Sequence, residues 1–392
     1  MKSRHPCLLL AGGRIAIDAQ EAVRTDLSVC DSRISHATQT ANIIRLDGYI
    51  VLPGLINAHD HLEFGMFPRL GSGPYPNWEA WAQDIYRPDG PPVRDLLAVP
   101  KHLRLWSGGL RNLLCGATTV AEHNPYHAKI FAHDFPVKVL SRYGWAHSLK
   151  DEQTAKAAYH QTPSEWPFFL HLAEGTDAAA AKEVDRLKQM VPLDDRLVLV
   201  HGIGIRRKQL HELSAAKVWL VWCPSSNIFT LGKTFSAKTV RAYPYLLLGS
   251  DSPLSAVGDL LDELSFAHEH SGLSAEALYP MVTTRAAAAL RLENGEGSIR
   301  AGAAADLIVL RDSGKSPAET LLWASRNDIQ CVIRDGALQF VSPVFSERVS
   351  AHLLDDFEES TWGGTTRLFP VSTCEKIREI QTYHEQIAEA LV

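Results

Sequence analysis

The stretch Pro53-Gly54-Leu55-Ile56-Asn57-Ala58-His59-Asp60-His61 decides the fold, because an apolar strand ends there in two histidines. Side chains two positions apart on a strand point in the same direction, so His59 and His61 can present two imidazoles to one point. Imidazole is a good ligand for Zn and for Fe. Two packed or solvated histidines would give the same pair, so the interpretation as a metal site depends on the rest of the chain.

Three further apolar runs end in a residue that is able to bind a metal ion, namely His171, His201 and Asp251. One charged residue past a strand is readily explained by solvation, but three such ends together with the histidine pair form a pattern. In a (β/α) barrel all the parallel strands end at one face, and this face carries the active site. A barrel would therefore bring the four segments to one point.

The middle of the chain alternates apolar strands with helical stretches. Strands are expected at residues 51–57, 117–122, 137–145, 167–171, 197–201, 218–223 and 245–250, and helices at residues 177–189, 208–216, 259–270 and 274–290. The strands are short and apolar along their whole length, which is typical of a parallel sheet covered on both faces. The pattern favours a (β/α) barrel or a doubly wound sheet. Because only seven strands are counted, one β/α unit near residue 150 is expected to be shortened, irregular or absent.

Both ends of the chain have the sequence pattern of short strands separated by turns. It covers residues 7–52 and returns around residues 297–336, so the ends are expected to meet in one small β domain. The predicted organisation is a composite β-sandwich from residues 1–52 and 298–345, a barrel from residues 53–297, and a C-terminal helical extension over residues 346–392. The last helix is expected at residues 374–392.

Composition excludes several classes of protein. The 392 residues are 45% hydrophobic and 21% charged, with a formal net charge of −6. A nucleic-acid partner would require a basic face, and no apolar run approaches the ~18–20 residues that span a bilayer. The apolar run after Arg4 is too short for a signal peptide and is expected to be a first strand. The six scattered cysteines, with no C-x-x-C pair, predict reduced thiols and a cytoplasmic location.

Taken together, these segments resemble the amidohydrolase superfamily, in particular the branch of cytosine-, guanine- and adenosine-type deaminases and triazine hydrolases. Each motif is weak alone, but their order and spacing are specific. The resemblance rests on the segment from Pro53 to His61, Gly116-Ala117-Thr118-Thr119, His171-Leu172-Ala173-Glu174, Val200-His201-Gly202, Cys223-Pro224-Ser225-Ser226-Asn227, Ser250-Asp251 and Gly297-Ser298-Ile299 with Ala305-Asp306-Leu307. It implies a TIM-like (β/α)8 barrel with a small β-sandwich built from both chain ends.

The resemblance also implies roles for particular residues. The ligands of one divalent metal ion, Zn first and Fe as the alternative, are implied to be His59, His61, His171 and Asp251. Glu174 is implied to shuttle protons, His201 to polarise the substrate or orient the attacking water, and Asp251 to accept the proton of that water. Dinuclear members bridge their metals with a modified lysine. Lys138 lies inside an expected strand rather than at its end, which favours one metal.

Three residues are weaker candidates for contact with substrate. His123 follows a strand but is equally explained as a solvated strand end. Asn227 follows a strand within turn-like sequence, and Trp81 lies in an aromatic loop over residues 67–89 that could be a lid or a patch for a partner subunit. This loop departs from the pattern of several relatives, so the resemblance names no substrate.

The leading hypothesis is the hydrolytic deamination of a nitrogen heterocycle by metal-activated water. The alternatives are the ring opening of a cyclic amide of the imidazolone type, a triazine-type hydrolysis, and a catalytically silent metal-binding paralogue. The expected partner is a small molecule rather than a nucleic acid or a membrane, and a homodimer is common among the relatives that the chain resembles.

Overall fold

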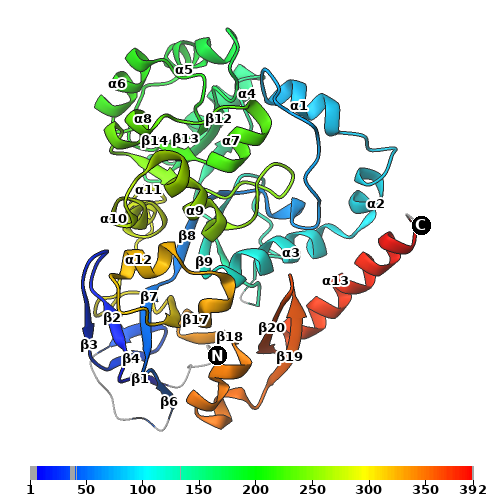
Figure 1. Ribbon diagram of the computed structural model, residues 1–392. Coiled ribbons are helices and arrows are strands. Elements are labelled where there is room, and N and C mark those ends of the chain that lie inside the picture. The colour runs from blue at the N-terminus through cyan, green and yellow to red at the C-terminus, as the bar shows by residue number, and fades with distance from the viewer. Residues whose placement is uncertain (1–6, 36–39, 41, 133, 391–392) are drawn as a thin grey trace.

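The computed structural model describes residues 7–35, 40, 42–132 and 134–390 of the chain. Within them, eight short parallel strands form the centre and helices pack outside (Figure 1). Three strands pair in the order β10-β9-β8, and five pair in the order β11-β12-β13-β14-β15. The amide of Asp251, just past β15, donates to the carbonyl of His59 in β8 (3.1 Å). The two sheets are therefore the arcs of one (β/α)8 barrel.

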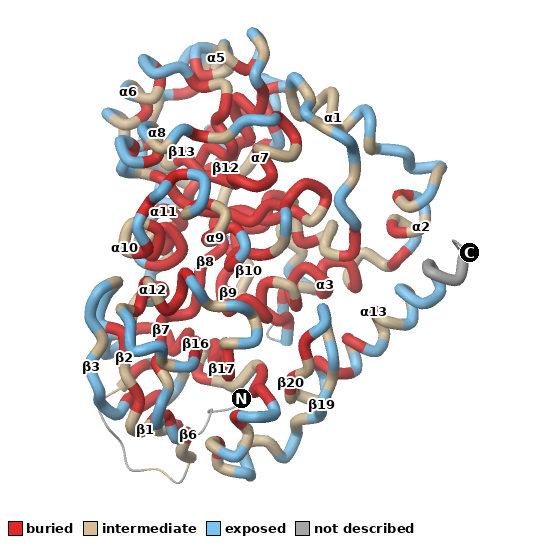
Figure 2. The backbone as a smooth tube through the Cα atoms, viewed as in Figure 1, coloured by how far each residue is buried: buried red, intermediate tan, exposed pale blue. Residues whose placement is uncertain are grey.

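Apart from β10 and β11, the barrel strands are almost wholly buried (Figure 2), as expected for strands with helices on the outside and packed side chains within. Their bounds are β8 Leu55–Asp60, β9 Ala117–Glu122, β10 Lys138–Val139, β11 Gly144–Ala146, β12 Phe168–Leu172, β13 Leu197–His201, β14 Trp219–Trp222 and β15 Leu246–Leu248.

The strand expected at residues 51–57 is two strands, which corrects the sequence prediction. β7 (Tyr49–Pro53) belongs to the sandwich, whereas β8 begins the barrel. The chain passes between them at Gly54, where a Cβ atom would lie 2.3 Å from the side chain of Thr118. The close packing at this glycine explains why an unbroken apolar run contains a change of sheet.

The strand expected at residues 137–145 is also two strands, and this raises the barrel count from seven to eight. β10 pairs with β9, and β11 pairs with β12. Residues 140–143 are all that connects them, and the described part of the chain between β9 and β11 contains no helix. The barrel therefore does have one shortened unit, but not at the position predicted: α4 (Glu152–Gln161) fills the connection near residue 150, and the unit that lacks a helix is the preceding one, between β10 and β11.

The helices follow the strands largely as expected. The first segments are η1 Leu62–Phe64, α1 Trp78–Ile85, α2 Val93–Ala98, α3 Lys101–Leu114, α4 Glu152–Gln161, η2 Ala180–Lys182, α5 Glu183–Met190, α6 Arg207–Ala215, α7 Pro224–Leu231, α8 Ala237–Ala242 and α9 Leu260–Ser271. The helix expected at residues 274–290 is broken into α10 (Ala275–Leu278), η3 (Tyr279–Val282) and α11 (Thr284–Ala289). Two residues account for the break. Pro280 lies in η3 and cannot continue the hydrogen bonding of α10, and the non-helical backbone of Thr283 separates η3 from α11.

The small β domain combines N-terminal strands with strands from residues 307–370, and the two sets lie side by side in Figure 1. An eight-stranded sheet has the order β19-β20-β18-β17-β16-β7-β2-β3, and a four-stranded sheet has the order β5-β4-β1-β6. The N-terminal strands are β1 Leu8–Ala11, β2 Arg14–Ala16, β3 Ala22–Arg24, β4 Leu27–Cys30, β5 Arg33–Ser35 and β6 Ile43–Arg45. The C-terminal strands are β16 Leu307–Arg311, β17 Ile329–Arg334, β18 Ala337–Val341, β19 Phe357–Trp362 and β20 Thr365–Pro370.

The larger sheet separates two hydrophobic cores. Side chains alternate across a strand, so Val51 of β7 packs in the sandwich core while Ile50 and Leu52 pack in the barrel core. In β16, which pairs with β7, Val309 faces the sandwich and Ile308 faces the barrel. The barrel therefore rests on a sheet that is buried on both faces.

The C-terminal segment, expected as a helical extension, contains a β-hairpin as well as helices. β19 and β20 pair with each other, and β20 joins the edge of the larger sheet at β18. α12 (Pro317–Leu322) is followed by η4 (Arg326–Asp328), η5 (Pro343–Arg348) and η6 (Ala351–Leu354). α13 (Val371–Ala390) packs against α3. Nowhere in the described residues is a helix both long enough and apolar enough to cross a membrane.

The cysteines depart from the prediction that all of them are reduced. Cys7 and Cys30 form a disulfide, while the four other cysteines are free and buried. β1 and β4 pair antiparallel with Leu8 opposite Val29, which places the two cysteines opposite each other at the end of the ladder. The proximity of the two cysteines is not evident from the sequence, because 23 positions separate them. The cytoplasmic location that was expected from reduced cysteines stays a prediction.

Candidate metal centre and active site

The carboxyl ends of four barrel strands bring five potential metal ligands together. The ligand atoms lie within 4.8 Å of one another in two overlapping groups, one of His59, His171 and His201 and the other of His59, His61 and Asp251. All four residues predicted as ligands lie in this cluster, and so does His201, which was predicted to act on substrate. His59 belongs to both groups and thus links His171 on one side to His61 and Asp251 on the other.

The imidazoles at the centre of the cluster suit a cation. Nδ1 of His171 lies 2.8 Å from the carbonyl of His147, and a carbonyl only accepts, so the hydrogen of neutral His171 is on Nδ1. Its Nε2 lone pair then faces Nε2 of His59 at 3.4 Å. Burial lowers the pKa of both histidines well below 6.5, which keeps the rings neutral. Nδ1 of His59 is also buried and has no hydrogen-bond partner.

Asp251 supplies the negative charge of the cluster. One carboxylate oxygen lies 3.7 Å from Nε2 of His59 and 3.9 Å from Nε2 of His61. The other accepts hydrogen bonds from the hydroxyls of Ser226 (2.6 Å) and Ser255 (3.0 Å). Burial acts to raise the pKa of Asp251, but the neighbouring histidines and the hydroxyl of Ser226 outweigh it and lower this pKa. Three neutral imidazoles and an ionised carboxylate form a set that divalent Zn and Fe bind.

Three residues at these strand ends have left-handed backbone angles. The φ values are 52° at Ala173, 70° at His201 and 53° at Asp251. Such angles are uncommon for residues other than glycine, and they persist where surrounding contacts hold them, often at functional sites. The amide of Ala173 donates to the carboxylate of Glu183 (2.6 Å), which holds the turn between His171 and Glu174.

Glu174 lies beside His201 at the edge of the cluster. Its carboxylate oxygen is 3.6 Å from Nε2 of His201, and its side chain is about 10% exposed. Burial raises the pKa of Glu174 to about 7, so a fraction of the molecules carries a proton there at neutral pH. A carboxyl group with such a pKa can both donate and accept a proton near pH 7.

The side chain of Asn227 fixes the orientation of His201. Oδ1 of Asn227 accepts from Nδ1 of His201 (2.9 Å), which leaves the Nε2 lone pair of neutral His201 directed toward Glu174. Contacts that orient an imidazole in this way typically change affinity or rate 10- to 100-fold when they are removed.

We expect Asn227→Ala to lower kcat about 10- to 100-fold without loss of metal, because the ring of His201 is then free to rotate. Steady-state kinetics and metal analysis test this, with Asn327→Ala at an exposed position as the matched control. Asn227→Asp retains the acceptor oxygen and should restore part of the rate. An unchanged kcat in Asn227→Ala would contradict a positioning role.

The cluster opens into a cavity of about 230 Å³. Its polar lining gathers at one end, whereas the remaining wall consists of apolar and aromatic side chains. The polar residues are His61, His147, His171, Glu174, His201, Asp251 and Ser252. A substrate in this cavity would thus meet the metal ligands and Glu174 at the same end.

The three weaker candidates occupy different positions. Trp81 lines the cavity, as predicted for a substrate contact. His123 is not among the lining residues but stacks on His171, with ring centres 3.9 Å apart. Asn227 is fully buried behind His201. The positions of His123 and Asn227 therefore indicate that they support ligating or reacting histidines rather than touch the substrate.

Sequence reasoning missed a buried network beneath the cluster. Asp60, between the two histidines of β8, accepts from Arg111 (2.7 Å) and Asn112 (2.6 Å) of α3. Arg111 also donates to the carbonyl of Asp251 (2.8 Å), and Asn57 donates to Ser250 (2.7 Å). The network joins β8 to the end of β15 and so fixes both groups of ligands. The position of Asp60 between His59 and His61 was the only feature of the sequence that pointed to this network.

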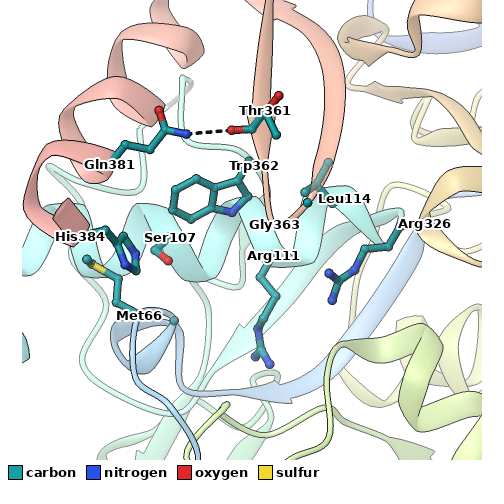
Figure 3. Close-up of a pocket in the computed structure, with 12 residues that line it drawn as sticks. Met66, Ser107, Arg111, Leu114, Arg326, Thr361, Trp362, Gly363, Gln381 and His384 are labelled. Atoms are coloured by element: carbon teal, nitrogen blue, oxygen red, sulfur yellow. Dashed lines mark hydrogen bonds between the residues drawn. The ribbon is translucent and has the colours of Figure 1, made fainter. Parts of the chain in front are cut away.

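A second, larger cavity of about 460 Å³ lies between α3, α13 and the β19–β20 turn (Figure 3). Its wall includes Trp362, His384 and the side chain of Arg111. Figure 3 shows Arg111 pointing away from Trp362, in keeping with its bonds to Asp60 and Asp251. None of the clustered metal-ligand candidates lines this cavity, so we assign the chemistry to the smaller one.

Lys138 is committed to a structural role outside the cluster. Its ammonium group forms ion pairs with Asp306, Asp335 (3.3 Å) and Glu296 (3.6 Å). These contacts tie β10 to the segment that leads into the sandwich. Lys138 is therefore held outside the cluster and is not in a position to bridge two metal ions there. Its place inside a strand agrees with the prediction from the sequence.

Comparison with known proteins identifies relatives of this chain. Residues 147–338 match the model of the Amidohydrolase family. The chain is 27% identical over 191 residues to a 5-methylthioadenosine/S-adenosylhomocysteine deaminase of Pyrococcus horikoshii, and 28% identical over 191 residues to the protein of that name in Thermococcus sibiricus. Each match covers 43% of this chain and 45% of the relative, so the chain spans about half the length of these relatives or less.

Solved structures share the fold over most of the chain. An adenosine deaminase from Xanthomonas campestris with bound zinc has a TM-score of 0.74 and 18% identity, with 97% of this chain and 98% of the other covered. A triazine hydrolase from Arthrobacter aurescens has a TM-score of 0.71 and 18% identity, with coverages of 85% and 94%. The chain thus matches the Amidohydrolase family model over residues 147–338 and shares its fold with an adenosine deaminase and a triazine hydrolase.

Proposed function

We propose that the protein is a metal-dependent hydrolase that deaminates a nitrogen heterocycle. The observation that carries this proposal is the position of Glu174, which has a pKa raised to about 7 and shares a small cavity with a cluster of histidines and an aspartate. The names of the relatives support it, because the matched proteins from Pyrococcus and Thermococcus are called deaminases.

A divalent ion at this site would be held by His59, His61, His171 and Asp251. When bound, it would supply Lewis acidity that makes hydroxide available from water near neutral pH. We favour Zn over Fe, because a cluster of imidazoles with one carboxylate is a common zinc donor set and a fold relative is described with bound zinc. We also favour one ion, since Lys138 is held in ion pairs elsewhere.

The residues of the chain would manage the protons. Asp251, which its lowered pKa keeps ionised, would accept the proton that the attacking water loses. Glu174 would donate its proton to the ring nitrogen next to the carbon under attack, take up the proton of the newly added hydroxyl and pass it to the departing amine. The proton held by Asp251 would then return to Glu174 and restore the starting state. His201, oriented by Asn227, would present the lone pair of Nε2 and accept a hydrogen bond from the attacking water, which orients that water.

The overall reaction consumes one water and releases one ammonia. A carbon–oxygen bond forms at the ring carbon that carries the amino group, and the carbon–nitrogen bond to that amino group breaks. The oxygen remains on the heterocycle as a carbonyl, and the adjacent ring nitrogen retains a hydrogen. Protons are redistributed without any oxidant or reductant.

Ammonia release separates this proposal from its main rivals. We expect the metal-loaded protein to release one ammonia per molecule of aminoheterocycle consumed, measured with a coupled assay on a panel that also contains cyclic amides and chlorotriazines. Turnover of a cyclic amide without ammonia would instead support ring opening, and chloride release would support triazine-type hydrolysis. Absence of any turnover would favour a silent metal-binding paralogue. A homodimer stays a prediction.

A further inference from the structure

The cavity wall opposite the metal ligands is apolar and rich in aromatic rings. It is contributed by the segment after β8, by α1 and by α2, which together close the barrel mouth. The side chains that form most of this wall are Phe64, Phe67, Trp78, Trp81, Ile85 and Leu97. Flat aromatic surfaces of this kind bind heteroaromatic rings by stacking and by burial of carbon.

The wall has no group that would pair with an anion. Among the described residues that line the cavity there is no lysine or arginine, and two carboxylates, Glu174 and Asp251, are present. Lys150 lies outside it, with its ammonium 5.9 Å from the ring centre of Trp78, and is paired with Glu79. A phosphate or carboxylate on the substrate would therefore lose its hydration without gaining a partner.

The wall offers few partners for hydroxyl groups, chiefly the indole N–H of Trp78. Nε1 of Trp81 is already used, since it donates to the carbonyl of Leu70 (3.0 Å). Tyr86 lines the cavity as well, but it is 64% exposed and so lies where the cavity meets solvent. The hydroxyls of a sugar attached to the ring would thus lie against carbon. At about 230 Å³ the cavity is also smaller than the ~300–1,000 Å³ usual for drug-sized ligands.

We propose that the substrate is a small, uncharged heteroaromatic amine whose other substituents are short and apolar, and that nucleosides are poor substrates. This inference rests on the proposed deamination, because it assumes that the amino-bearing carbon lies at the polar end beside Glu174. The rest of the ring and its substituents then contact the apolar wall.

Matched pairs of compounds test the proposal directly. In adenosine and 9-propyladenine the ring and the amino group are the same, and only the substituent differs; cytidine and 1-propylcytosine form a second pair. We expect kcat/KM for ammonia release to be about 10- to 100-fold higher for the propyl compound in whichever pair is turned over. Equal values, or a preference for the nucleoside, would overturn the proposal.

A charge placed in the wall should change this selectivity. Leu97→Lys should raise the ratio of kcat/KM for 9-carboxymethyladenine to that for 9-propyladenine about tenfold or more, since the carboxylate gains a partner. The matched control is Val344→Lys, which adds the same charge at an exposed position of the sandwich and should leave the ratio unchanged. An unchanged ratio in Leu97→Lys would contradict the assignment of the wall.

Failure of the proposed function is distinguishable from failure of this inference. If no compound releases ammonia, deamination is contradicted, and equilibrium binding then decides the inference. Quenching of tryptophan fluorescence should report tighter binding of the propyl compounds by about tenfold or more, because Trp78 and Trp81 line the cavity. Binding that does not distinguish propyl from ribosyl compounds would overturn it.

Discussion

Glu174→Gln is expected to lower kcat about 10²- to 10⁴-fold while the metal content of the protein stays unchanged. The amide has nearly the same shape as the acid but cannot deliver a proton to a ring nitrogen. Glu174 is suited to that delivery, because burial raises its pKa to about 7 and its carboxylate lies 3.6 Å from His201. Single-turnover ammonia release and metal analysis on the same preparation provide the measurement.

The matched control is Glu269→Gln, which makes the same chemical change at an exposed position of α9. It should leave both kcat and metal content as they are in the parent. Full activity in Glu174→Gln would remove the proton shuttle from the mechanism. Loss of metal together with activity would assign Glu174 to the metal centre instead.

His61→Ala is expected to abolish turnover by weakening metal binding more than about 100-fold, since even residues behind a ligand contribute 10- to 100-fold. His61 is a better choice than His59, because its side chain is 12% exposed whereas that of His59 is fully buried. Removal of the imidazole should therefore disturb the core less. Metal affinity measured by competition with a chromophoric chelator reports the loss.

Two comparisons accompany this variant. His211→Ala, at an exposed position of α6, should bind metal and turn over substrate like the parent. Dialysis of the parent against a chelator should remove activity, and Zn should restore it. Parent-like metal affinity in His61→Ala would place the ion elsewhere in the protein.

Much of the site follows from the sequence because strand ends are local features. An apolar run followed by His171, His201 or Asp251 needs only the rule that parallel strands end at one face, and the structure brings these residues together. The spacing of His59 and His61 likewise needs only the two-residue repeat of a strand. The resemblance to a family added the roles that these short-range rules leave open.

Features that depend on contacts distant in sequence were not predicted. Arg111 reaches Asp60 and the carbonyl of Asp251 from α3, and nothing in its own helix points to those partners. The disulfide between Cys7 and Cys30 depends on the register of β1 against β4. The division of residues 137–145 into β10 and β11 is set by pairing with different neighbours rather than by the run itself.

The central claim is that His59, His61, His171 and Asp251 hold one divalent ion at the mouth of the barrel. Anomalous diffraction from crystals of the zinc-loaded protein, recorded above and below the zinc edge, tests it most directly. The account predicts a single strong peak bounded by these four side chains. A peak at another location, or two peaks within the cluster, would contradict it.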